Sequence, residues 1–306
     1  MIDGTFEPRH LRYNRVAVLT ALALGVAVVL QPWGIALAQQ TTRVSLPNTE
    51  YREFTSQATR RPYSVFVALP ESYKADTARR YPVVYVTDAH VSFPLATQIY
   101  RLMRLSDDVP ELIIVGIDGT NPETWAAARF LDLTPTRNEA REAEVSTSLG
   151  QPVRSGDAAG FSRVLTTELL PDIEKRYRVT DDRTLVGHSL GGLFGTYMLF
   201  HAPNTFRRMI LISPALYWDD TVTFRHEEKY AAASRVLRAQ LFIAAGSLES
   251  TSMLGNVKRF TAVLAERKYE GLVLHSLVFA EETHTSVGPA AIARGLRVMF
   301  QKQSLH

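Results

Sequence analysis

The spacing Gly-x-Ser-x-Gly occurs at Gly187-His188-Ser189-Leu190-Gly191. The apolar run 184–186 before it is typical of a strand, and residues 190–201 after it have the pattern of a helix. Both glycines are needed, because a Cβ would collide across so sharp a strand-to-helix turn. Such a turn lifts Ser189 Oγ out of the sheet and lets the Leu190 N–H face a developing oxyanion. Ser189 is therefore the candidate nucleophile.

A serine hydroxyl attacks poorly until a base takes its proton and an acid holds that base. Both partners should come just after strands of the same sheet. Glu249 follows the apolar run 241–245, and His284 follows the last such run, 272–279. The order Ser189, Glu249, His284 is the order of the α/β-hydrolase triad. Asp219 or Asp220, after the preceding strand, remains the alternative acid.

Two other histidines lie near the predicted centre. His188 fills the variable position beside Ser189, where we expect its side chain to point away from the reacting atoms. His90 follows the strand that should supply a second oxyanion N–H, and we expect it to line the pocket. No metal or other cofactor is expected, because His226-Glu227-Glu228 lacks the second histidine of a zinc helix.

Apolar runs that alternate with helical patterns must carry these residues. The alternation predicts an α/β fold, with a mainly parallel central sheet and helices on both of its faces. Ligand chemistry in such a fold belongs at the carboxyl ends of the strands. The shorter runs 50–56 and 63–69 are expected to pair as an antiparallel edge. The expected strands of the parallel part of the sheet, with the residues that end them, are 81–88, 112–117, 184–188, 209–214, 241–246 and 272–279.

Residues 125–160 interrupt this rhythm. The stretch is long, and its second half is polar, so we expect an irregular insertion that forms the lip or lid of the active site. A disordered surface loop is the alternative. Residues 161–177 are expected to form a helix that bends or restarts at Pro171, and Asp181-Asp182 to form the turn into the nucleophile strand. Residues 217–220 are expected to form an aromatic loop.

The first 38 residues have the parts of a secretory signal peptide. Three arginines precede the apolar run 16–30, and Ala36-Leu37-Ala38 is typical of a cleavage site. We therefore expect export to a periplasm or beyond the cell, cleavage after Ala38, and one hydrolase domain over residues 39–306. An uncleaved membrane anchor over 16–38 is the alternative, since that stretch is nearly long enough to span a bilayer.

Composition narrows the classes of function. The chain has 306 residues, 46% of them hydrophobic and 21% charged, which suffices for one sizeable core. The net charge of +3 is too small to imply nucleic acid, and no basic run is interleaved with aromatics. Zero cysteines exclude disulfides, thiolate metal sites and a cysteine nucleophile. The expected partner is a small-molecule ester, with no membrane contact after signal cleavage; the oligomeric state is left open.

From about residue 63 to 300 the chain resembles the esterase branch of the α/β-hydrolases. That branch contains bacterial siderophore esterases, esterase D, feruloyl esterases and mycolyl transferases, and the likeness is strongest to the siderophore-esterase group. It implies Ser189, Glu249 and His284 as the triad. One departure is Asp88-Ala89, where the family usually has Asp-Gly, which leaves Ala89 and His90 as alternative second oxyanion donors. The matching stretches are 81–88, 129–136, Glu168-Leu169-Leu170-Pro171 with Tyr177, 187–194, Ser213-Pro214 with Trp218, 246–249, and His284 with Ser286-Val287.

The resemblance and the triad together predict an exported serine carboxylesterase. A siderophore lactone or another bulky aromatic ester is the expected substrate, with Tyr217 and Trp218 near the site and Arg129 placed to meet an anionic group. The alternatives are that Trp218 is core packing and Arg129 part of an ion pair. An acyltransferase on the same triad, or a non-catalytic binding module on the same fold, are the other functions left open.

Overall fold

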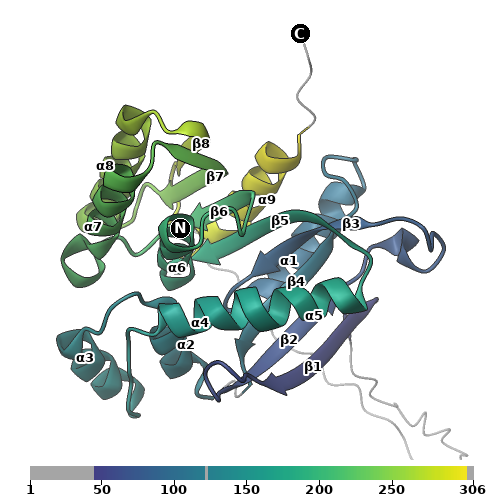
Figure 1. Cartoon of the computed structure of the whole chain (residues 1–306), viewed down its shortest axis with the longest axis horizontal. Helices are drawn as coiled ribbons and strands as arrows, with labels where there is room; N and C mark the ends of the chain where they lie inside the picture. The colour runs from purple at the N-terminus through teal and green to yellow at the C-terminus, as the bar shows by residue number, and fades with distance from the viewer. Residues whose placement is uncertain (1–44, 121–122, 302–306) are drawn as a thin grey trace, which may run out of the picture. The chain divides into compact units, whose positions relative to one another are not determined.

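An eight-stranded sheet forms the centre of the computed structural model, which describes residues 45–120 and 123–301 (Figure 1). The strand order is β1-β2-β4-β3-β5-β6-β7-β8. From β4 to β8 all neighbours are parallel, and β2 pairs antiparallel with β1 on one side and β4 on the other. The strands are β1 Thr49–Thr55, β2 Pro62–Ala68, β3 Tyr81–Val86, β4 Ile113–Gly119, β5 Val179–His188, β6 Arg208–Ile212, β7 Val236–Gly246 and β8 Glu270–Phe279.

Helices cover both faces of the sheet and divide the core in two. On one face α1 and α9 pack on the sheet through Phe93, Ile292 and Leu296. The opposite face is covered by α4 to α8, with Phe161, Phe194 and Phe260 in the larger core. The helices are α1 Ala89–Arg104, α2 Trp125–Leu133, α3 Glu139–Leu149, α4 Ala158–Arg163, α5 Leu170–Arg176, α6 Leu190–His201, α7 Trp218–Ala233, α8 Thr251–Arg267 and α9 Val287–Phe300.

The central strands consist almost wholly of apolar residues because both of their faces are covered. Val83 to Val86 of β3 are at most 1% exposed, as are Ile113 to Val115 of β4. Strands buried on both sides read as continuous apolar runs, whereas the edge strand β1 alternates between half-buried and exposed residues. The predicted α/β fold, the antiparallel edge and the helices on both faces are confirmed.

The insertion over residues 125–160 differs from its prediction, because it contains the two helices α2 and α3 instead of irregular chain. The ends of α3 are specified locally. Asn138 Oδ1 accepts a hydrogen bond from the Arg141 N–H at 3.1 Å, and Gly150 has a φ of 65° just past the last turn. The second half of the insertion is polar because α3 is largely exposed, not because this part of the chain lacks structure. A lid role for this segment stays a prediction.

The segments on either side of the nucleophile strand β5 agree only in part with their predictions. The helix over 161–177 does restart near Pro171: α4 is followed by the π-helical segment Val164–Leu169, and Pro171 lies in the first turn of α5. Asp181 and Asp182 are not a turn, since both lie within β5, and Asp182 pairs with Arg208. The expected aromatic loop is instead the start of α7, kinked by positive φ angles at residues 219–221.

The predicted signal peptide, residues 1–38, lies outside the described residues. Within residues 45–120 and 123–301, no helix is long and apolar enough to cross a membrane.

Candidate active site

Ser189 stands on a strained turn between β5 and α6. Its φ of 57° and ψ of −114° lie outside the regions that a non-glycine residue ordinarily occupies. A Cβ at Gly187 would overlap the carbonyl oxygen of Gly191, so the turn tolerates only glycine there. The Ser189 N–H donates to the Ile212 carbonyl oxygen at 2.9 Å, which ties the turn to the end of β6. The predicted strand, turn and helix are all present.

The Ser189 side chain is available for chemistry. The residue is half-buried, and its hydroxyl has no hydrogen-bond partner within the part of the chain that the structure describes. Hydrogen bonds between a nucleophile and its base are often long in ligand-free enzymes and tighten when substrate binds. Ser189 Oγ is therefore a free hydroxyl at the start of a helix.

His284 and Glu249 are brought together as predicted. The distance between His284 Nδ1 and Glu249 Oε2 is 3.0 Å, although 35 residues separate them in sequence. The Glu249 side chain is 1% exposed, whereas His284 is 37% exposed. Since an ionised carboxylate can only accept, the hydrogen-bond network assigns the proton to Nδ1 and leaves Nε2 as the acceptor. This is the tautomer that a general base needs.

Ser213 is a residue that the sequence did not identify as part of the site. Its hydroxyl donates to Glu249 Oε1 at 2.5 Å, and the Gly246 N–H donates to the same oxygen at 2.6 Å. Ser213 follows β6 with a φ of 44° and is fully buried. With His284 on the other oxygen, the buried carboxylate has three donors, which offset the cost of removing its charge from water. Its place directly after a buried strand was the available signal.

The loops that carry the acid and the base are joined by main-chain hydrogen bonds. The Leu248 N–H donates to the Glu282 carbonyl oxygen at 2.9 Å, and the Ser247 N–H donates to the Phe279 carbonyl oxygen at 2.8 Å. A Cβ at Gly246 would overlap the Glu282 carbonyl oxygen, so the two loops approach closely there. Because β7 and β8 are parallel neighbours, their carboxyl ends deliver both loops to the same edge of the sheet.

His188 does not point away from the reacting atoms, which corrects the expectation from sequence. Its ring packs against that of His284 with centroids 4.6 Å apart, and its Nε2 lies 2.8 Å from the His284 carbonyl oxygen. Burial, followed by the nearby His284, lowers the pKa of His188. The position before the nucleophile therefore carries a neutral imidazole that contacts the loop of the base.

The alternative acids lie elsewhere. Asp219 Oδ2 is 3.5 Å from Arg225 Nη2, and the Asp220 carbonyl oxygen accepts from Arg225 Nη1 at 2.8 Å. In the part of the chain that the structure describes, His284 Nδ1 pairs with Glu249 and with neither of these two aspartates.

The two candidates for the second oxyanion donor can be separated by their partners. The His90 N–H donates to Asp118 Oδ2 at 3.2 Å, and the His90 ring contacts the same oxygen at 3.0 Å. Ala89 and Leu190 begin α1 and α6, so their N–H groups have no acceptor within their own helices. In the described residues no acceptor is found for the N–H groups of Ala89 and Leu190, so Ala89 stays the candidate for the second donor.

The predicted substrate-binding residues differ in how much surface they offer. Trp218 is 2% exposed and donates from Nε1 to the Thr136 carbonyl oxygen at 3.2 Å, so its ring belongs to the core in this conformation. Tyr217 is half-buried, with the Arg141 guanidinium 6.0 Å from its ring centre. Arg129 makes a two-pronged ion pair with Asp88, with distances of 2.7 and 3.0 Å.

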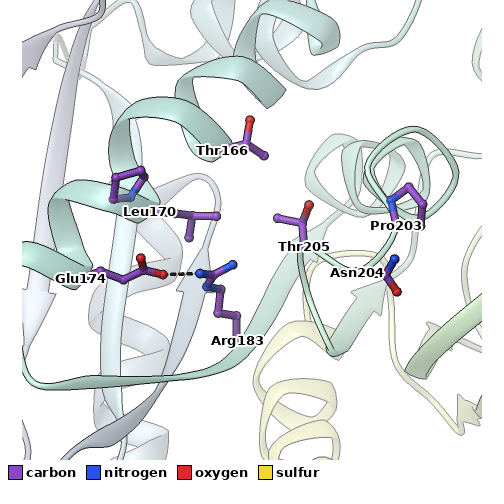
Figure 2. A pocket seen from close by; sticks show the side chains of 8 residues that line it. Thr166, Leu170, Glu174, Arg183, Pro203, Asn204 and Thr205 are labelled. Atoms are coloured by element: carbon purple, nitrogen blue, oxygen red, sulfur yellow. Dashed lines mark hydrogen bonds and ion pairs between the residues drawn. The ribbon is translucent and has the colours of Figure 1, made fainter.

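Within the described residues, no three His, Asp or Glu side chains gather in a way that could hold a metal ion. A pocket of about 430 Å³ lies at the amino ends of β5 and β6, between α5 and the loop after α6 (Figure 2). Its walls include the ion pair of Arg183 with Glu174, which Figure 2 marks with a dashed line. The Ser189 turn follows the carboxyl end of β5, so this pocket is separate from the candidate active site.

Residues 56–253 match the protein family described as "Putative esterase". This chain belongs to that esterase family. The family match covers the Ser189 turn and Glu249. The resemblance to the esterase branch that the sequence predicts is thereby confirmed. Like its relatives, this esterase is an enzyme that hydrolyses carboxylic esters.

Relatives of this esterase include two proteins named for siderophore hydrolysis. The chain is 28% identical to the ferri-bacillibactin esterase BesA of Bacillus subtilis, over 86% of this chain and 93% of BesA. It is 26% identical to the siderophore triacetylfusarinine C esterase of Aspergillus fumigatus, over 88% of this chain and 99% of that protein. Among solved structures, the BES protein from Bacillus cereus superposes with a TM-score of 0.72 at 25% identity, covering 84% and 97% of the two chains.

Proposed function

We propose that this chain is an exported serine esterase that hydrolyses siderophore-type esters through Ser189, His284 and Glu249. The observation that carries the proposal is the 3.0 Å contact between His284 Nδ1 and Glu249 Oε2, at the same sheet edge as the Ser189 turn. A buried carboxylate with three donors holds a half-exposed imidazole, whose second nitrogen remains free for the proton of a serine.

In the proposed acylation step, Ser189 Oγ attacks the ester carbonyl carbon while His284 Nε2 takes its proton. The carbonyl oxygen becomes an oxyanion and is bound by the N–H groups of Leu190 and Ala89. The C–O bond to the alcohol then breaks as His284 returns the proton to the leaving oxygen. Glu249 stabilises the imidazolium that exists between these two proton transfers.

Deacylation repeats the sequence with water as the nucleophile. His284 removes a proton from the water, the hydroxide adds to the acyl carbon, and the Ser189 oxygen leaves with the proton that His284 supplies. The free acid is released and the hydroxyl of Ser189 is restored. The 37% exposure of the His284 side chain gives water a route to the imidazole.

The siderophore class of substrate is supported by the names of two relatives aligned over more than four-fifths of this chain. A siderophore lactone is a bulky ester, so it needs an open site. Tyr217, at the start of α7, is the predicted substrate-binding side chain that keeps an exposed surface here. We propose it as a contact for the acyl portion of the substrate.

Export is part of the proposal and rests on the sequence of residues 1–38 alone. In this view the mature enzyme is one hydrolase domain that starts at Gln39. The intact mass of the protein from a periplasmic or culture fraction tests this point: cleavage after Ala38 is expected, and a full-length, membrane-associated chain would contradict it.

The test of the catalytic proposal is the Ser189→Ala variant. Hydrolysis of p-nitrophenyl acetate should fall by at least about 10³-fold, because only binding and the oxyanion donors would remain. Thermal unfolding should match the wild type, since the Ser189 hydroxyl has no hydrogen-bond partner to lose among residues 45–120 and 123–301. Full turnover in the variant would refute the proposal. A trilactone compared with acetate and butyrate esters tests the substrate class: preference for the short esters would contradict it.

A further inference from the structure

Arg129 and Asp88 form a largely buried ion pair beside the proposed site. Arg129 Nε lies 2.7 Å from Asp88 Oδ1, and Nη2 lies 3.0 Å from Oδ2. Their side chains are 15% and 7% exposed, and the Trp125 ring centre is 5.3 Å from the guanidinium carbon. Burial alone would lower the pKa of Arg129, but the Asp88 carboxylate outweighs it and the pKa is raised. Arg129 is thus a permanent cation already committed to Asp88.

Asp88 lies next to one of the proposed oxyanion donors. It directly precedes Ala89 and adopts a left-handed conformation, with φ 56° and ψ 48°. Its Oδ2 lies 3.3 Å from the place that a Cβ on Gly191 would occupy, in the first turn of α6. Asp88 is thus the residue before α1, and its carboxylate approaches the first turn of α6, the helix that begins at Leu190. The N–H groups of Ala89 and Leu190 are the two donors proposed to bind the oxyanion.

A bare carboxylate at this place would oppose catalysis. The transition state places a negative charge on the carbonyl oxygen, and a buried carboxylate repels such a charge more strongly than one surrounded by water. A second acid is already close by: burial, and then the Asp88 carboxylate, raise the pKa of Asp118 to about 6. The guanidinium of Arg129 is the cation that pairs with Asp88 directly.

The pair also fixes the shape of the turn. Two parallel hydrogen bonds from a planar guanidinium hold a carboxylate in one orientation. Asp88 has a strained φ, so its conformation persists only if its surroundings hold it. Next along the chain, the His90 N–H is held by Asp118, which leaves Ala89 between two anchored residues.

We propose that Arg129 is a positioning residue, which holds the Asp88–Ala89 turn in place and neutralises the Asp88 carboxylate beside the oxyanion donors. This inference rests on the proposed function and deepens it. It assigns Arg129 an effect on the rate of the chemical step with any ester, charged or neutral. Two roles for Arg129 were open from the sequence, contact with an anionic group of the substrate and a structural ion pair, and the inference gives the ion pair an effect on catalysis.

The test uses Arg129→Gln, Asp88→Asn and the double variant, with neutral p-nitrophenyl acetate as substrate. In Arg129→Gln, kcat should fall about 100-fold, the order of effect of removing one oxyanion donor, with little change in KM. The double variant should recover at least about tenfold over Arg129→Gln, because it lacks the unpaired carboxylate. A double variant no faster than Arg129→Gln would overturn the charge argument.

Two further variants separate positioning from simple loss of stability. Arg129→Lys keeps the charge but not the two-pronged contact, so its kcat should lie between those of the wild type and Arg129→Gln. Arg267→Gln is the matched control, because Arg267 contacts buried Glu227 with distances of 2.9 and 3.1 Å. It should lower the melting temperature without changing kcat. An equal loss of kcat in Arg267→Gln would assign the Arg129 effect to stability.

A substrate comparison addresses the competing role. If Arg129 binds an anionic group, Arg129→Gln should raise KM for an ester that carries a carboxylate and leave kcat for p-nitrophenyl acetate unchanged. That result would overturn the inference while wild-type turnover and the Ser189→Ala loss still uphold the proposed function. Full turnover by Ser189→Ala would instead refute the function itself.

Discussion

His188 Nε2 lies 2.8 Å from the backbone carbonyl oxygen of His284, and the two rings pack with centroids 4.6 Å apart. A carbonyl oxygen only accepts, so the network assigns a proton to His188 Nε2. Burial and the neighbouring His284 both favour the neutral form of His188. The residue next to the proposed nucleophile thus holds the main chain of the proposed base.

Replacing His188 by Phe should slow catalysis without abolishing it. The aromatic ring keeps the packing against His284 but removes the donor, so the loop of the base loses one hydrogen bond, worth about 1 kcal/mol. We expect kcat for p-nitrophenyl acetate to fall about tenfold. His188→Gln, which keeps an N–H donor, should lose less. Wild-type kcat in His188→Phe would show that this contact does not position His284.

Glu249→Gln tests the acid. The amide keeps the shape of the side chain but offers an N–H where His284 Nδ1 needs an acceptor, which favours the wrong tautomer. We expect kcat to fall by about 10³ to 10⁴ in steady-state assays, by analogy with loss of the triad acid in other serine hydrolases. Asp219→Asn is the control, since its carboxylate faces Arg225, and it should retain activity. The reverse pattern would make Asp219 the acid.

Gly187→Ala tests the tightness of the nucleophile turn. The added Cβ would overlap the Gly191 carbonyl oxygen, so the backbone must shift. We expect the free energy of unfolding in urea to fall by about 2 kcal/mol or more, with loss of activity. Gly255→Ala, in the exposed interior of α8 with no atom within 4 Å of the new Cβ, should instead gain about 0.5–1 kcal/mol. Equal effects from both changes would contradict the steric account.

Much of the proposed site can be predicted because the ends of buried strands are visible in the sequence. Ser189, Glu249 and His284 each follow an apolar run, and parallel strands bring their carboxyl ends to one edge. The directions in which the side chains of the site point are harder to predict from the sequence. The contact of His188 with the loop of His284 depends on how β8 ends, and the Arg129–Asp88 pair joins α2 to the end of β3 across 41 residues.

The same limits explain the errors in the fold. The sequence predicts irregular chain over residues 125–160 because α3 is polar on most sides, and a helix with little apolar surface has weak periodicity. Asn138 and Gly150, which cap its two ends, were the local signals for that helix. For Trp218 the sequence leaves two interpretations open, substrate contact and core packing, and the structure supports core packing. Whether an aromatic side chain faces solvent or core is decided by the layers packed around it.

His226 provides a prediction on the pH dependence of stability. Burial, and then the neighbouring His201, lower the pKa of His226 to about 4. The folded chain therefore binds a proton at His226 more weakly than the unfolded chain does. The neutral imidazole contributes fully to the free energy of unfolding above about pH 6.5, and this contribution is lost as the pH falls towards 4.

Urea unfolding of His226→Gln between pH 7 and pH 4 measures this contribution. The wild type should lose more stability than the variant over that range, by about 1 kcal/mol once solvent screening of the half-exposed ring is allowed for. His275→Gln, on the exposed strand β8, controls for removal of a histidine. Parallel pH profiles for the wild type and His226→Gln would contradict the prediction.

Peptide mapping after reaction with a fluorophosphonate shows whether Ser189 is the nucleophile. We expect one adduct per chain, on the peptide that contains Ser189, with loss of activity in proportion to labelling and little labelling in His284→Ala. An adduct at another residue, or no adduct on a protein that remains fully active, would contradict the assignment of Ser189 as the nucleophile.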